Sequence, residues 1–372
     1  MNVSGLCFIL GVSLYNPPVT PQTNPRFNVN LLLDYTAADQ TIALLEGEVI
    51  GTKALAELRA NRIAASTTGF IANREAVTGH LEGYLDSLKY HQTIHDDVYH
   101  LETARKEVRE IKELLYEIIR RNLNRKVVAT VEQIFPPDAD IDVAIPVFIV
   151  ALGHENVDAY VRRIVWHGNV PEFVGEGEGE LTIVVNLSHA VTYGSETEER
   201  FVNLLGVVAH EVFHAAFSAY KDVSPTWKSY RAKHAEYFDE LMELTQNEGI
   251  AYYLSVDQRG HGYLPRDWHD KIRDLFSTFN RNSQELLSRD LKPRRAAELL
   301  RAANLSGFWE SYGAMVGMSI AREIDLRLGR GALIETISLG PRDFFRKYIR
   351  LAEADGNLPL LHKKVTDIIL EP

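Results

Sequence analysis

The chain has 372 residues, 45% of them hydrophobic and 24% charged, which is the composition of a globular protein with a substantial buried core. Its formal net charge is −11, and Lys and Arg are scattered among Asp and Glu. We therefore expect no nucleic-acid partner, which would call for a basic stripe. Cys7 is the only cysteine, so an internal disulfide and a thiolate metal cluster are excluded, and any metal must be bound by histidines and carboxylates.

The N-terminal segment, residues 1–30, has two interpretations. Its apolar run GLCFILGVSLY and the proline-rich NPPVTPQTNP after it are typical of a cleaved signal peptide, although no Lys or Arg precedes the run. A first strand followed by a loop explains the segment equally well. The compartment, cytoplasmic or exported, stays open, as does the oligomeric state. No run elsewhere is long and uncharged enough to cross a bilayer, so we expect no integral membrane span.

Residues 31–137 are predicted as a helical N-terminal region. Apolar residues recur three and four apart in TAADQTIALLEGE (36–48), TKALAELRAN (52–61) and HLETARKEVREIKELLYEIIRRNL (100–123). Just before the last of these, His91 and His95 would share a helix face, and Asp96 and Asp97 follow them. A second metal is conceivable there, but a solvated face of a charged helix is the better interpretation, and we assign no site.

Residues 138–372 are predicted as the catalytic region, which could be continuous with the helical part as a single domain. Two strands are indicated at its start, over the β-branched VAIPVFIVAL (143–152) and the alternating ELTIVVNLSH (180–189). From residue 196 onward the periodicity is helical almost to the end. The expected fold class is therefore α+β, mainly α-helical with a small mixed sheet.

The segment VVAHEVFHAAF (207–217) holds His210 and His214 four residues apart, with Glu211 directly after the first. A capping-box pattern, Ser195-Glu-Thr-Glu198, predicts the start of this helix near residue 196, and its apolar composition predicts burial on all sides. Histidines at i and i+4 project from one face and can bind one tetrahedral ion. Glu211, about 100° round the helix, would lie beside the ion as a general base for its water. The alternative is two core histidines bonded to the backbone.

A catalytic zinc site needs a third protein ligand and an open position for water. The metzincin pattern would require a glycine and a histidine where this sequence has Phe217 and Tyr220, so that class is excluded. The remaining route is a glutamate from a following helix.

Such a helix is predicted over KHAEYFDELMELTQNEGIAYYLSV (233–256). At about 100° per residue, Glu248 is the one acid centred on its apolar face, and three other acids fall opposite: Glu236, Asp239 and Glu243. We therefore expect Glu248 to be the third ligand, with His234 as the reserve candidate. The alternative is a buried glutamate paired with Arg or Lys.

The pattern His210-Glu211-x-x-His214 followed by Asn247-Glu248-Gly249 resembles the gluzincin branch of the zincin-fold metallopeptidases. The tail SYGAMVGMSIAREIDLRLGRGALIETISLGPRDFFRKY (311–348) is similar to that of a group of bacterial proteins assigned, without further characterisation, as zinc-dependent peptidases. The resemblance covers roughly residues 140–350. It implies a zincin-like fold, Zn²⁺ on His210, His214 and Glu248, Glu211 as base, and a peptide or protein substrate.

Peptide hydrolysis also needs a donor for the oxyanion that develops on the carbonyl. Tyr312, in the small-residue helix FWESYGAMVG, is the first candidate and His261, in RGHGYLP, the second. A packing tyrosine and a solvated loop histidine are the alternatives. The strand at 180–189 could bind an extended substrate at a sheet edge or could be a simple core strand.

We thus expect a zinc-dependent hydrolase, a metallopeptidase of the gluzincin type. Two alternatives remain from the sequence. One is a non-catalytic scaffold in which zinc ties two helices together, and the other is a zinc amidase or esterase acting on a non-peptide substrate.

Overall fold

A computed structural model describes residues 27–72, 80–154, 157, 159–174, 178–259, 264–304 and 309–371. Most of the N-terminal segment, with its signal-peptide and strand interpretations, lies outside these residues, as does His261.

Five strands form one mixed sheet in the order β1-β2-β5-β3-β4. β1, β2 and β5 run parallel to one another, whereas β3 is antiparallel to both β5 and β4. The mainly helical α+β class with a small mixed sheet is therefore confirmed. The strand bounds are β1 Phe27–Asp34, β2 Ile141–Val150, β3 Ala159–His167, β4 Val170–Val174 and β5 Glu180–Asn186.

The sheet is a middle layer between two hydrophobic cores, because alternate residues of a strand point to opposite faces. On β2, Val147 and Ile149 belong to the larger core, while Phe148 and Val150 belong to the smaller one. Burial on both faces explains why this strand is continuously apolar in sequence. The larger core also takes side chains from residues 108–132 and from the helices that follow the sheet, and the smaller core takes them mainly from residues 37–101.

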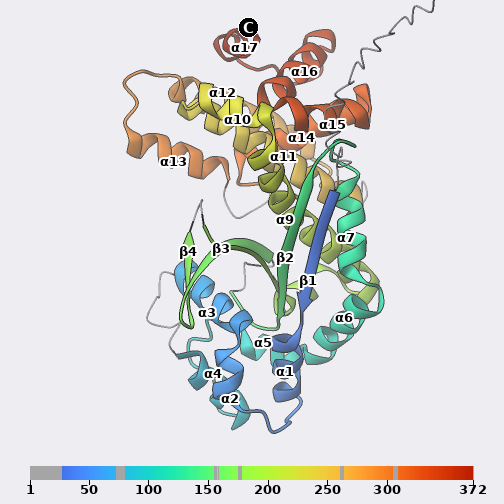
Figure 1. Cartoon of the computed structure of the whole chain (residues 1–372), viewed down its shortest axis with the longest axis vertical. Coiled ribbons are helices and arrows are strands. Elements are labelled where there is room, and N and C mark those ends of the chain that lie inside the picture. The colour runs from blue at the N-terminus through green and yellow to red at the C-terminus, as the bar shows by residue number, and fades with distance from the viewer. Residues whose placement is uncertain are drawn as a thin grey trace, which may run out of the picture.

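Most of the N-terminal helices gather at one end of the molecule, while the last of them, residues 123–132, lies beside β1 (Figure 1). They are shorter than predicted: extended backbone at Leu58 separates the second stretch into two helices, and the 100–123 stretch is broken at Glu107 and again at Asn122, which adopts φ 51°. Residues 91–100 are turns, so His91 and His95 share no helix face. The helices are α1 Thr36–Leu45, α2 Thr52–Glu57, α3 Arg59–Ile71, α4 Leu81–Lys89, α5 Leu101–Lys106, α6 Val108–Arg120 and α7 Leu123–Glu132.

The helices from residue 225 onward gather at the opposite end, and α9 (Thr197–Val223) runs from them along the sheet (Figure 1). The short α8 (Leu187–Ala190) instead packs against α5 and α6. A short 3₁₀ turn, Val191–Tyr193, links α8 to α9. The helices are α8 Leu187–Ala190, α9 Thr197–Val223, α10 Pro225–Lys233, α11 Tyr237–Arg259, α12 Trp268–Leu286, α13 Pro293–Ala303, α14 Tyr312–Leu328, α15 Arg330–Leu339, α16 Pro341–Ala354 and α17 Lys363–Leu370.

Helix α9 is long and apolar enough, by length and composition, to cross a membrane, which the sequence analysis did not expect. However, 56% of its most apolar window is buried inside the protein. The helix packs against β2, β3, β5, α7 and α11. It has the surroundings of the central helix of a globular core, and its apolar composition follows from that position.

Candidate metal centre

Helix α9 positions three of the predicted site residues. It begins at Thr197, one residue after the predicted start, but the predicted capping box does not form: the Ser195 backbone N–H donates to Glu199 instead. The helix is also not buried on all sides. The face bearing His210, Glu211 and His214 is partly exposed, while the residues around it are buried. Solvent therefore reaches this face of the helix.

Helix α11 supplies Glu248. It begins at Tyr237 rather than at the predicted residue 233, because residues 234–236, between α10 and α11, are not helical. The prediction that Glu248 lies on the buried face agrees with its exposure of only 9%. Asp239, placed by helical angle on the opposite face, is buried as well, with 7% exposure, and faces Arg342 and His234. Helical angle alone missed the burial of Asp239 because α16 covers the second face of α11.

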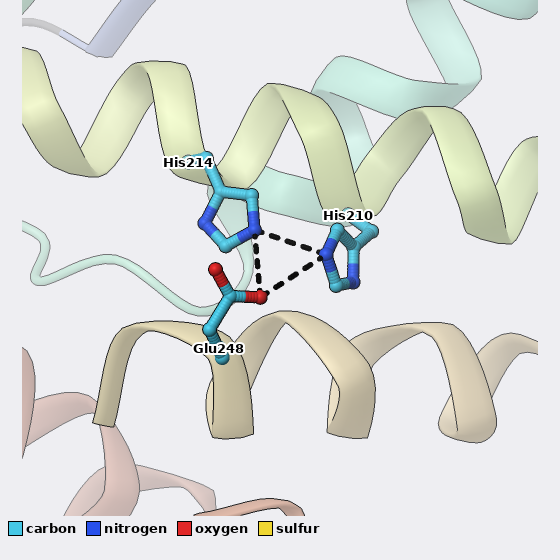
Figure 2. Close-up of side chains that lie close together, drawn as sticks. All are labelled: His210, His214 and Glu248. Carbon is cyan, nitrogen blue, oxygen red and sulfur yellow. Dashed lines mark hydrogen bonds and ion pairs between the residues drawn. The ribbon is translucent and has the colours of Figure 1, made fainter. Parts of the chain in front are cut away.

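The structure brings His210, His214 and Glu248 together between α9 and α11 (Figure 2). The two Nε2 atoms are 2.9 Å apart, and Oε2 of Glu248 lies 3.6 Å from that of His210 and 3.3 Å from that of His214. Donor atoms of a tetrahedral zinc site, at about 2.0–2.2 Å from the ion, are about 3.3–3.6 Å from one another. Two of the three separations fall in that range, whereas the two Nε2 atoms lie closer together. The donor set therefore fits one zinc ion in chemistry and needs the two imidazoles to move slightly apart to fit it in spacing.

Three neighbours orient these side chains, and no sequence pattern had indicated a role for any of them. Nδ1 of His214 lies 3.3 Å from Oδ1 of Asn247, which can accept its proton and leave Nε2 free to face the site. The ring of Tyr252 packs edge-on against that of His210, with centroids 4.6 Å apart. The side-chain amide of Asn304 donates to Oε1 of Glu248 at 2.8 Å. Asn247 and Tyr252 could have been found, because they stand next to Glu248 and one turn beyond it.

Opposite charges act strongly on each other in this site. Burial lowers the pKa of His214, but the facing carboxylate of Glu248 more than offsets this effect and raises it to about 9. Glu211 contributes to the same rise, so its carboxylate lies within electrostatic reach of the pair. Burial raises the pKa of Glu248, but His214 and His210 hold it well below its usual value. The metal-free site therefore holds an ion pair in which a proton on His214 stands in for a cation.

Helix α11 is held in place by an unusually close approach of α14. A Cβ added to Gly317 would lie 1.9 Å from the carbonyl oxygen of Thr245, and one added to Gly249 would lie 2.2 Å from the carbonyl carbon of Gly317. Only glycine allows the two backbones to approach so closely. Gly249 directly follows Glu248, so this contact fixes the helix turn that presents the carboxylate.

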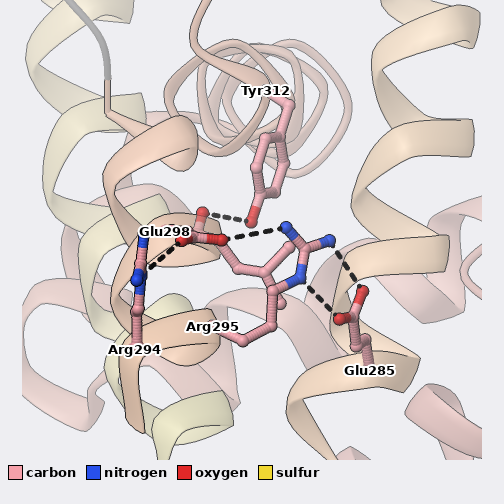
Figure 3. Close-up of polar contacts among 6 residues, drawn as sticks. Glu285, Arg294, Arg295, Glu298 and Tyr312 are labelled. Carbon is pink, nitrogen blue, oxygen red and sulfur yellow. Dashed lines mark hydrogen bonds and ion pairs between the residues drawn. The ribbon is translucent and has the colours of Figure 1, made fainter. Parts of the chain in front are cut away.

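Of the other predicted residues that the structure describes, Tyr312 and His234 have partners outside the triad of His210, His214 and Glu248. The hydroxyl of the buried Tyr312 donates to the carbonyl oxygen of Leu299 at 2.9 Å, beside the Arg295–Glu285 ion pair (Figure 3). Its proton is thus used in packing α14 against α13, and we do not retain it as an oxyanion donor. The reserve ligand His234 stacks on Tyr230, 4.6 Å between centroids. His261, the second oxyanion candidate, is outside the described residues.

Strand β5, the segment considered for substrate binding, lies inside the sheet between β2 and β3. Its backbone pairs on both sides, so the edge-strand interpretation was wrong and the core-strand interpretation is correct. A surface groove of about 760 Å³ lies elsewhere, along α12 and α14. No triad residue lines it, and we assign it no part in the chemistry.

Comparison with known proteins gives one result. A family model described as "Putative zinc dependent peptidase (DUF5700)" matches residues 53–357 of the chain. No curated protein and no solved structure matches it. The matched span contains α9, α11 and every residue of the triad.

Proposed function

Because the chain belongs to this family, we propose that it is a zinc-dependent metallopeptidase of the gluzincin type. In this proposal His210, His214 and Glu248 bind the ion, and Glu211 is the general base. The observation that supports it is the convergence of two imidazole nitrogens and one carboxylate oxygen within 3.6 Å of one another. A zincin-like fold and a peptide substrate belong to the same proposal.

Zinc, when bound, would polarise the substrate carbonyl and lower the pKa of a water ligand to about 7. Glu211 is partly exposed on the same face of α9 as the two histidines. From there it would take the proton of the attacking water and deliver it to the leaving amine. Asn247, by accepting from Nδ1 of His214, would keep that ring in the tautomer whose Nε2 binds a metal.

The number and exposure of the ligands favour an enzyme over a structural zinc scaffold. Structural zinc sites are closed by four protein ligands, whereas catalytic sites use three and leave a position open. Among the residues that the structure describes, only His210, His214 and Glu248 form such a group, and their face of α9 is partly exposed. Peptides tested beside small amides and esters would separate a peptidase from the amidase or esterase alternative.

Metal analysis of the purified protein tests the proposal. We expect about one equivalent of zinc in the wild type and almost none in His214→Ala, because two remaining ligands bind zinc poorly. His234→Ala is the matched control, since it removes a histidine that contacts Tyr230 and Asp239 rather than the triad, and it should retain zinc. A wild type that neither contains zinc nor takes it up would refute the proposal.

Zinc affinity should rise with pH. The pKa of His214 is about 9 in the folded metal-free protein against 6.5 for a free histidine, so below pH 9 the ion must displace a proton. Displacing one proton makes the apparent affinity rise about tenfold per pH unit up to about pH 9. Competition with a chelator at pH values from 6.5 to 9 measures this slope. An affinity independent of pH over this interval would mean that His214 is already neutral.

The same pair affects the stability of the metal-free protein. A histidine with a raised pKa contributes stability that is fully present below pH 6.5 and is lost as the pH rises through about 9. Glu248, with a lowered pKa, contributes stability above its unfolded value of 4.5 that is lost at more acidic pH. The protective effect of zinc on unfolding should therefore increase between pH 6.5 and 9.

A further inference from the structure

The two carboxylate oxygens of Glu248 have different partners. Oε2 faces Nε2 of both histidines, whereas Oε1 accepts a hydrogen bond from the side-chain amide of Asn304 at 2.8 Å. On the basis of the proposed function, we propose that Asn304 is a positioning residue for the metal centre. It holds Oε1 and thereby presents Oε2 alone to the ion.

This role has a physical basis in the freedom of a glutamate side chain. The carboxylate can rotate about its last torsion, which has a broad, roughly two-fold profile, and either oxygen could then face the histidines. A donor fixed beside one oxygen removes this freedom before the ion arrives. Outer partners of this kind orient ligating carboxylates in metal sites generally, and their loss costs about 10- to 100-fold in metal affinity.

Asn304 is itself exposed, and its place beside Glu248 depends on the helix before it, which contacts its neighbours on two sides. Asn304 directly follows α13, whose last turns receive the hydroxyl of Tyr312 on the Leu299 carbonyl oxygen. Near the start of α13, Arg295 forms two hydrogen bonds with Glu285 of α12, at 2.7 and 3.1 Å (Figure 3). The buried Tyr312 thus links α13 to α14 by a hydrogen bond, and α14 also packs against α11 at Gly317.

Two variants separate the effect of the Asn304 hydrogen bond from the effect of the volume of its side chain. Asn304→Ala removes both, while Asn304→Leu keeps a side chain of similar length that cannot donate. Asn203→Ala is the matched control, because the Asn203 amide also makes a part-buried bond, to the Tyr193 carbonyl oxygen at 2.7 Å, on the metal-binding helix α9 but away from the triad. For each protein, the dissociation constant for zinc is measured by chelator competition. The visible spectrum of the Co²⁺-loaded protein then reports the ligand arrangement.

We expect both Asn304 variants to bind zinc about 10- to 100-fold more weakly, with an altered Co²⁺ spectrum, while the control matches the wild type. Wild-type affinity in Asn304→Ala, or in Asn304→Leu alone, would overturn the inference, since the amide would then be dispensable. An equal loss in Asn203→Ala would overturn it as well, because the effect would be non-specific. Failure of the proposed function is distinguishable: the wild type would bind no zinc, or His214→Ala would bind it as tightly.

Discussion

Glu211→Gln should lose about 10²- to 10⁴-fold in the rate of peptide hydrolysis while it still binds one zinc, because the proposed base contributes to proton transfer and not to metal binding. Glutamine preserves the length and shape of the side chain but cannot accept the proton of the attacking water. The partly exposed position of Glu211 beside His210 makes the substitution easy to tolerate in the fold. The measurement pairs kcat on a peptide substrate with zinc content in the same preparation.

Glu198→Gln is a suitable control for this experiment. Glu198 lies in the first turn of the same helix, its side chain is 64% exposed, and it pairs with Arg121 rather than with the triad. We expect wild-type rates from it. Undiminished hydrolysis in Glu211→Gln would contradict the assignment of the base and favour the scaffold hypothesis, in which zinc binding matters for stability only.

Gly317→Ala adds one methyl group near the site, and we expect it to destabilise the protein more than a methyl group added elsewhere around the site. Its Cβ would lie 1.9 Å from the Thr245 carbonyl oxygen and 2.8 Å from Cα of Gly249, and both are backbone atoms that cannot rotate away. Overpacking of this kind costs about 1–3 kcal/mol and sometimes more. We expect a loss at or above the upper end of this range in chemical denaturation of the metal-free protein. Zinc affinity should fall as well, since a displacement of α11 would move Glu248 from its place facing the two histidines.

Gly331→Ala provides the comparison. Gly331 lies in α15, and a Cβ there would meet nothing within 4 Å. Alanine is favoured over glycine in a helix by up to about 1 kcal/mol, so this variant should be as stable as the wild type or slightly more stable. If Gly317→Ala and Gly331→Ala unfold at the same denaturant concentration, the backbones of α11 and α14 leave room for a methyl group at Gly317, and the close approach is contradicted.

The elements with strong periodicity were predictable from the sequence. Strands β2 and β5 and helix α9 were located within a few residues, because buried apolar runs and a helix of 27 residues leave clear patterns. Strand β3 was missed, since AYVRRIVWH alternates poorly and carries two adjacent arginines. Strand β1 was missed as well, although the first half of FNVNLLLD alternates apolar and polar residues. The breaks at Leu58 and Asn122 depend on local backbone angles that periodicity does not register.

In the site as well, the residues on regular helices were predictable, and the residue that the tertiary fold brings in was not. His210, Glu211 and His214 could be placed on one face of a helix, and Glu248 on the apolar face of another, because both helices are regular. That the two faces meet followed from the need for a third ligand and not from helical angles. Asn304 could not be predicted, since it meets Glu248 from 56 positions away, at the end of a separate helix. The small residues after Tyr312 are typical of a helix that packs closely against another, and Gly317 makes such a contact with α11. The tyrosine itself, at the first position of α14, turns to α13 instead.

The pairing of β1 with β2 has a consequence for biosynthesis. Asn28 and Asp142, which are bonded across these two strands, are 114 residues apart in the chain. The ribosome must therefore release a long stretch of polypeptide before the first strand finds its neighbour, and contacts of such high order slow folding. During this delay both strands present unpaired hydrogen-bonding edges, which invite aggregation. We expect recovery of native protein from denaturant to improve at low protein concentration.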